Sequence, residues 1–164
     1  MIEDLFEKSV LVLGCGNILL GDDGFGPAVI ECLNREKNLP DDVLAMDMGT
    51  SIRDILFDIM LSENKPKMIF IVDAVDRLDR KPGEVFEIPV EEIPENKTSD
   101  FSLHQHPTVN MLAELKDNFP VVIKIVAAQM EAVPEDIAPG LTPAMHGAVK
   151  IACEKILREV STRK

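Results

Sequence analysis

Three short, almost uninterrupted apolar runs constrain the fold of this chain more than any other feature of its sequence. They cover residues 10–13, 68–72 and 121–126. Apolar runs of this length are typical of strands that are covered on both faces, as the strands of parallel sheets are. We therefore expect these runs to form the centre of a parallel sheet.

Amphipathic patterns between the runs predict helices. Phe25, Val29 and Leu33 repeat at a spacing of four residues. Pro27 stands where the first turn of a helix tolerates proline, and we expect Gly26 to cap this helix. Further helices are predicted for residues 52–59, for the segment that follows His104 and His106, and from Thr142-Pro143 to the C-terminus.

Two further segments complete the predicted sheet. Residues 43–46 form another apolar run, whereas residues 84–88 follow the turn signal Lys81-Pro82-Gly83 and end at Pro89, which suits an antiparallel edge strand. Alternating strands and helices favour a three-layer α/β/α sandwich around a mostly parallel sheet. The length predicts one domain, residues 1–164. Residues 89–103 lack periodicity and are predicted to form a surface loop.

Composition excludes several classes of function. The formal net charge of -12 and the absence of Tyr and Trp disfavour nucleic acid as a partner. No apolar stretch approaches the roughly 18 residues of a membrane span, and the acidic N-terminal segment is unlike a signal peptide, so we expect no membrane. Three dispersed cysteines without a Cys-x-x-Cys pair indicate a reducing, cytoplasmic location.

Polar groups follow two of the predicted central strands and open a helix. The first strand leads into a glycine-rich segment that contains Asp22 and Asp23, the third leads into Asp73, and His104 and His106 precede a helix. Ligands of open α/β sheets bind beyond the carboxyl ends of the strands, so these groups converge if strands one and three are neighbours. Two carboxylates and an imidazole would form an incomplete shell for a borderline divalent ion.

Structural roles compete with this interpretation. Asp22 or Asp23 would also serve as a helix cap, and Asp73 would also bind loop amides. An exposed loop position is the competing possibility for His104, and exposed positions are expected for His106 and His146. The Cys15 thiol is expected to be buried and not nucleophilic, and the Asp-Thr-Gly-like segment that begins at Asp47 lacks the second copy that an aspartic protease needs.

Four motifs in order resemble those of the hydrogenase maturation endopeptidases. They are Gly16-Asn17-Ile18-Leu19-Leu20-Gly21-Asp22-Asp23-Gly24-Phe25-Gly26-Pro27, Asp47-Met48-Gly49-Thr50, Val72-Asp73-Ala74 with Pro82-Gly83-Glu84, and Ser102-Leu103-His104-Gln105. The resemblance covers nearly the whole chain and is greatest to the proteases of deazaflavin-reducing hydrogenases. Two departures are Met48, where glycine is frequent, and the segment 127–130, which lacks a proline.

This resemblance implies a twisted five-stranded sheet and an activity that removes the C-terminal extension of a [NiFe]-hydrogenase large-subunit precursor after nickel insertion. It also implies that Asp23, Asp73 and His104 contact the metal and mediate the reaction, with the attacking group unassigned and His106 outside the site. Three ligands without cysteine would hold nickel loosely, so we expect nickel to arrive with the substrate. We also expect the protease to be a monomer.

Two other functions remain open at this point. A non-catalytic nickel chaperone or sensor would use the same three ligands. A nucleotide-binding module would use the glycine-rich segment, although Gly14 and Gly16 are not followed by the third glycine of the dinucleotide fingerprint.

Overall fold

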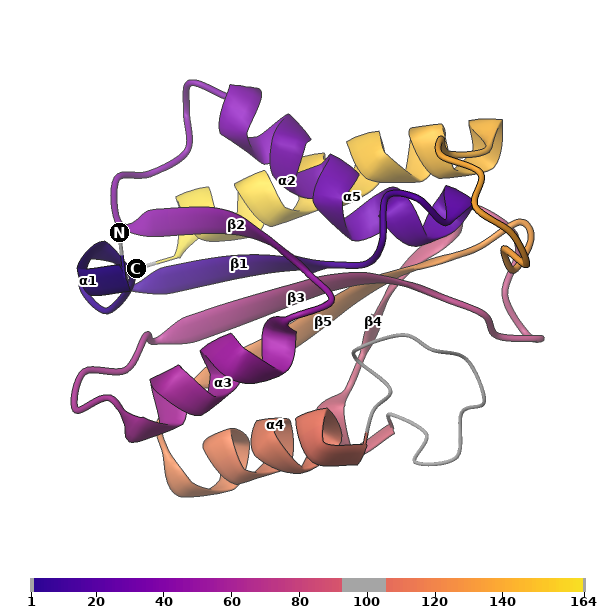
Figure 1. Cartoon of the computed structure of the whole chain (residues 1–164). Helices are drawn as coiled ribbons and strands as arrows, with labels where there is room; N and C mark the ends of the chain where they lie inside the picture. Colours follow the sequence, from indigo (N-terminus) through magenta and orange to yellow (C-terminus); the bar gives the residue numbers. More distant parts are fainter. Residues whose placement is uncertain (1, 93–105, 164) are drawn as a thin grey trace.

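The computed structural model describes residues 2–92 and 106–163, which form a five-stranded sheet with helices on both faces (Figure 1). In chain order the elements are α1 (Ile2–Leu5), β1 (Val10–Cys15), η1 (Gly21–Gly24), α2 (Phe25–Arg35), β2 (Val43–Gly49), α3 (Ile52–Leu61), β3 (Met68–Val75), β4 (Val85–Ile88), η2 (Val90–Glu92), α4 (His106–Asn118), β5 (Val122–Gln129) and α5 (Pro143–Thr162). The predicted α/β/α sandwich is confirmed.

The sheet has the strand order β2-β1-β3-β5-β4. All neighbours are parallel except β4, which pairs antiparallel with β5 at the edge, as the turn and proline signals predicted. The chain leaves β1 for β2 on one side, whereas β3 lies on the other side of β1. The carboxyl ends of β1 and β3 therefore form a topological switch point, where α/β sheets place their binding sites.

Successive side chains of the central strands point to opposite faces of the sheet and belong to two separate hydrophobic cores. Leu11 and Leu13 of β1 pack with α3 and α4, whereas Val10 and Val12 pack with α2 and α5. Both cores consist mainly of aliphatic and phenylalanine side chains, together with a few cysteine and methionine side chains, that are almost fully buried. This two-sided burial explains why the strands read as continuous apolar runs.

Several predicted boundaries were wrong. Strand β3 continues past Asp73 to Val75, because Asp73 still pairs with Ala127 of β5. The N-cap of α2 is Gly24, and Gly26 lies inside the first turn. The predicted loop at 89–103 begins with the short helix η2, whose Val90 is buried, and its remainder from residue 93 lies outside the described residues.

The last helix begins as predicted, with Thr142 as N-cap and Pro143 in the first turn. It packs beside α2 on one face of the sheet, while α3 and α4 cover the other (Figure 1). No helix in the described part of the chain has the length and hydropathy that a membrane span requires.

Candidate functional site

Asp23 and Asp73 lie at the switch point and are almost fully buried. Asp23 belongs to η1, which follows β1, and is 5% exposed, whereas Asp73 near the end of β3 is 1% exposed. The Cys15 thiol, at the end of β1, is fully buried near both of them. Burial raises its pKa well above the ordinary value, and the charges of Asp73, Asp23 and Asp47 raise it further. The structure therefore brings the two predicted carboxylates close to one buried thiol.

The two oxygens of Asp23 have different surroundings. Oδ2 accepts a hydrogen bond from the backbone N–H of Asn17 at 2.9 Å. Oδ1 is buried beside Gly16 and accepts no hydrogen bond from any described residue. Burial raises the pKa of Asp23, and the Asn17 hydrogen bond partly opposes this rise. A buried carboxylate oxygen of this kind lowers the stability of the fold unless a cation or a hydrogen-bond donor contacts it.

Replacing Asp23 with asparagine is expected to stabilise the free protein at neutral pH. Because the folded-state pKa is raised, the ionised carboxylate costs stability that is absent below the unfolded pKa of about 3.9 and grows as pH rises through the folded pKa. We expect the melting temperature of Asp23→Asn to exceed that of the parent by about 2–4 °C at pH 7, the effect of roughly 1 kcal/mol. The difference should vanish near pH 3. A difference independent of pH would contradict this explanation.

Asp22 has a structural role, although it is next to Asp23 in sequence. Its carboxylate accepts hydrogen bonds from the N–H of Glu131 at 3.0 Å, the N–H of Thr142 at 2.8 Å and the hydroxyl of Thr142 at 3.0 Å. These bonds join the glycine-rich loop to the segment that leads into α5. Asp22 therefore has a structural role, as the sequence allowed. Its carboxylate joins two loops by hydrogen bonds and does not cap α2.

Asp22→Asn is expected to lower the free energy of unfolding by about 2 kcal/mol. The amide keeps one acceptor oxygen but turns an NH2 group toward donors, so at least one charge-assisted hydrogen bond is lost. Urea unfolding would measure the change. Asp136→Asn is the matched control, because Asp136 is exposed in the loop that Asp22 holds and should shift stability by less than about 0.5 kcal/mol. Equal effects would contradict the role of Asp22.

The histidine and cysteine predictions have different outcomes. His104 lies outside the described residues, and so does the side chain of His106, although His106 begins α4. His146 is exposed on α5, as expected. Cys15 is fully buried, also as expected, and its raised pKa keeps the thiol neutral. The Asp47 carboxylate accepts a hydrogen bond from the N–H of Gly49 at the end of β2.

The amides of the glycine-rich loop are already used within the protein, which disfavours a phosphate site there. The N–H of Gly16 binds the carbonyl of Gly49, and that of Gly21 binds the carbonyl of Ala138. The N–H groups of Asn17, Leu19 and Leu20 also find acceptors within the loop. A dinucleotide fingerprint instead directs such amides at the pyrophosphate.

Sequence reasoning missed the structural role of Gln129. This side chain is buried at the end of β5, where its Oε1 accepts the N–H of Arg77 at 2.7 Å. Its Nε2 donates to Asp76 and to the carbonyl of Met130. Gln129 thereby fixes the segment that follows β3 and Asp73. A polar amide at the end of an apolar strand was the signal available in the sequence.

Comparisons with known proteins identify the family of this chain. A family model described as hydrogenase maturation protease matches residues 27–159. Coenzyme F420 hydrogenase subunit delta of Methanothermobacter thermautotrophicus is 36% identical over 162 residues, which cover 97% of this chain and 99% of the relative. Hydrogenase 2 maturation protease of Escherichia coli is 34% identical over 152 residues, which cover 90% and 88%.

The solved structure of the Escherichia coli hydrogenase maturating endopeptidase HybD has a TM-score of 0.72 and 31% identity to this chain, with 93% of this chain and 91% of that chain covered. The chain belongs to the hydrogenase maturation protease family and is an endopeptidase. The F420 hydrogenase relative is of the deazaflavin-reducing type, which confirms the resemblance stated from the motifs.

Proposed function

We propose that this endopeptidase removes the C-terminal extension of a [NiFe]-hydrogenase large-subunit precursor after nickel insertion, and that it recognises the nickel through Asp23, Asp73 and His104. The observation that carries this proposal is the buried Oδ1 atom of Asp23, which accepts no hydrogen bond from the described residues at the switch point. A buried carboxylate oxygen without a hydrogen bond lowers stability, so its presence favours a role in binding a cation or a substrate.

The donor set supports a metal of intermediate softness. Two carboxylates and one imidazole suit a borderline divalent ion and leave positions open for the precursor's own ligands. Helix α4 precedes β5, which is parallel to β3, so α4 begins at the carboxyl edge of the sheet. His104 precedes α4 by two residues in sequence, which supports its assignment as the third ligand.

In this proposal the nickel belongs to the substrate. Three ligands without thiolate hold nickel less securely than a closed site, so the protease would contact nickel that the precursor already binds. The ion would then report that insertion is complete and position the tail at the crevice. A cation at this position would also polarise the scissile carbonyl or a bound water.

Exposed apolar side chains beside the aspartates support a protein as the substrate. Ile18, Leu19, Val133 and Ile137 are all more than 45% exposed. Their two loops are joined by hydrogen bonds between Gly21 and Ala138 and between Ala138 and Leu19, and they lie side by side in Figure 1. Apolar groups gathered near a site in this way are typical of protein docking surfaces.

We further propose that the protease acts as a monomer in the cytoplasm, where the precursor is made. The three cysteines are free, as expected in a reducing compartment. The large-subunit precursor would be its macromolecular partner.

The test compares nickel-loaded and nickel-free precursor, each incubated with the protease, by mass spectrometry of the large subunit. Loss of the tail only from the loaded precursor is the expected result. Binding of free nickel without cleavage of either precursor would indicate the chaperone or sensor function instead. Cleavage of both forms at the same rate would contradict nickel recognition while preserving the endopeptidase assignment.

A further inference from the structure

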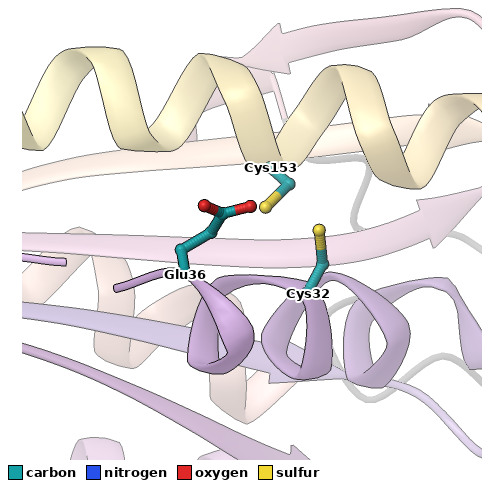
Figure 2. Close-up of side chains that lie close together, drawn as sticks. All are labelled: Cys32, Glu36 and Cys153. Atoms are coloured by element: carbon teal, nitrogen blue, oxygen red, sulfur yellow. The ribbon is translucent and has the colours of Figure 1, made fainter. Parts of the chain in front are cut away.

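A second group of potential metal ligands lies near the C-terminal end of α2, whereas the glycine-rich loop precedes that helix. Cys32 is in the last turns of α2, Glu36 is its C-cap, and Cys153 is in the middle of α5. Figure 2 shows the three side chains pointing toward one another across the contact between the two helices. Two sulfur atoms and one carboxylate oxygen lie within 4.8 Å of one another.

We propose that Cys32, Glu36 and Cys153 bind a soft or borderline divalent cation, with Zn²⁺ the best match, at a site separate from Asp23 and Asp73. Two thiolates and a carboxylate are ligands that Zn²⁺ accepts, and three protein ligands leave a fourth position for water. A tetrahedral ion with Zn–S bonds of about 2.3 Å needs sulfur atoms about 3.8 Å apart. The observed separations require a shift of only about 1 Å.

The side chains have the freedom to make this shift. Glu36 is exposed and terminates its helix, and Cys32 is half-buried, whereas Cys153 is buried and fixed within α5. Cys32 and Glu36 are four residues apart, so both project from the same face of α2. Closure around an ion would therefore require rotation of the two α2 side chains toward Cys153.

The local charges favour a cation. Glu36 lies at the C-terminus of α2, the end of a helix whose dipole attracts positive charge. Within the described part of the chain Glu36 forms no ion pair, and Arg35 beside it pairs with Glu31. The neighbouring groups that raise the pKa of Cys153 are Cys32, Glu36 and Glu154, none of which is cationic. Three electron-rich ligands thus face one another without a positive group between them.

Metal binding would displace the thiol protons into solvent. Burial raises the pKa of Cys153, and the Cys32 side chain raises it further, so the Cys153 thiol is protonated in the metal-free protein. The ion would join α2 to α5. Asp23 lies in η1, which directly precedes α2, and Thr142, whose N–H donates to Asp22, is the N-cap of α5. The same two helices therefore support the aspartate loop, residues 16–24. A cross-link between them would stabilise that loop.

The test uses Co²⁺ as a spectroscopic substitute for Zn²⁺ in protein kept reduced with a phosphine. We expect a near-ultraviolet thiolate-to-cobalt charge-transfer band that Zn²⁺ abolishes by displacement. Saturating Zn²⁺ should also raise the melting temperature by about 5 °C. The Asp23→Asn Asp73→Asn variant should retain the band, since carboxylates and imidazole alone give no thiolate transition.

Substitutions then assign the ligands. Cys32→Ser Cys153→Ser should remove the band, and Glu36→Gln should weaken Co²⁺ binding at least about tenfold. Because Glu36 is exposed, its replacement leaves folding intact. Glu154→Gln is the matched control, an exposed acid next to Cys153 outside the ligand set, and should bind Co²⁺ as the parent does. Absence of the band in the reduced parent, or equal affinities of the Glu36→Gln and Glu154→Gln variants, would overturn the proposal.

Discussion

Asp23→Asn and Asp73→Asn are each expected to slow removal of the precursor's tail by about 10²–10³-fold, which corresponds to roughly 3–4 kcal/mol of transition-state stabilisation. Both carboxylates are buried at the switch point, and Oδ1 of Asp23 accepts no hydrogen bond from the described residues. An amide keeps the shape of the side chain but cannot ligate a cation as a charged oxygen does. Mass spectrometry of the large subunit over time would give the rates with nickel-loaded precursor.

Asp58→Asn is the control for loss of one negative charge, because Asp58 is exposed on α3. Its rate should equal that of the parent. The melting temperature of Asp23→Asn, which we expect to exceed that of the parent at pH 7, would show whether unfolding contributes to the loss of activity. A protein that gains stability and loses activity on the same substitution has a residue kept for function. If both variants remove the tail at the rate of the parent, the proposal that Asp23 and Asp73 recognise the metal is contradicted.

Gly26→Ala is expected to destabilise the protein by about 3 kcal/mol or more. A Cβ at this position would lie 2.2 Å from the carbonyl oxygen of Cys15 and 2.6 Å from that of Val72. These are backbone atoms of β1 and β3, which cannot move without disturbing the sheet, so α2 would be displaced. Urea unfolding would measure the decrease in the free energy of unfolding. Displacement of α2 should also disturb the loop with Asp22 and Asp23 that precedes this helix.

Gly147→Ala provides the matched control for Gly26→Ala. Gly147 is exposed in α5, and a Cβ there meets no atom within 4 Å. Because alanine loses less backbone entropy than glycine in a helix, this substitution should stabilise the protein by about 0.5–1 kcal/mol. The same exchange in two helices should therefore change stability in opposite directions. Comparable effects at both positions would show that close packing of α2 on the sheet is not the reason for Gly26.

The fold was largely predictable from sequence because burial on both sides leaves a clear pattern. The apolar runs located β1, β3 and β5, and the turn before residue 84 located the antiparallel edge strand. Boundaries were less predictable. Gly26 was predicted to be a cap, and only the approach of α2 to Cys15 shows that its role is close contact with the sheet. Likewise, pairing with β5 keeps Asp73 inside β3.

The strand pattern predicted that Asp23 and Asp73 lie at the carboxyl edge of the sheet, but the different surroundings of Asp22 and Asp23 could not be predicted from local pattern alone. Asp22 and Asp23 are adjacent carboxylates, and their different roles depend on Thr142 and Glu131, which lie far along the chain. The motif resemblance selected Asp23, and the hydrogen bonds of Asp22 agree with that selection. The group of Cys32, Glu36 and Cys153 was missed because its members come from two helices that only the sheet brings together.

The central claim is that Asp23 and Asp73 contact nickel carried by the precursor. Binding affinities of the parent protease and of Asp23→Asn Asp73→Asn for nickel-loaded and nickel-free precursor form a closed thermodynamic cycle that isolates this contact. We predict that nickel tightens binding to the parent by about tenfold or more, equivalent to about 1.4 kcal/mol, and has little effect on binding to the variant. An equal effect of nickel on both proteins would show that the two aspartates do not contact the metal.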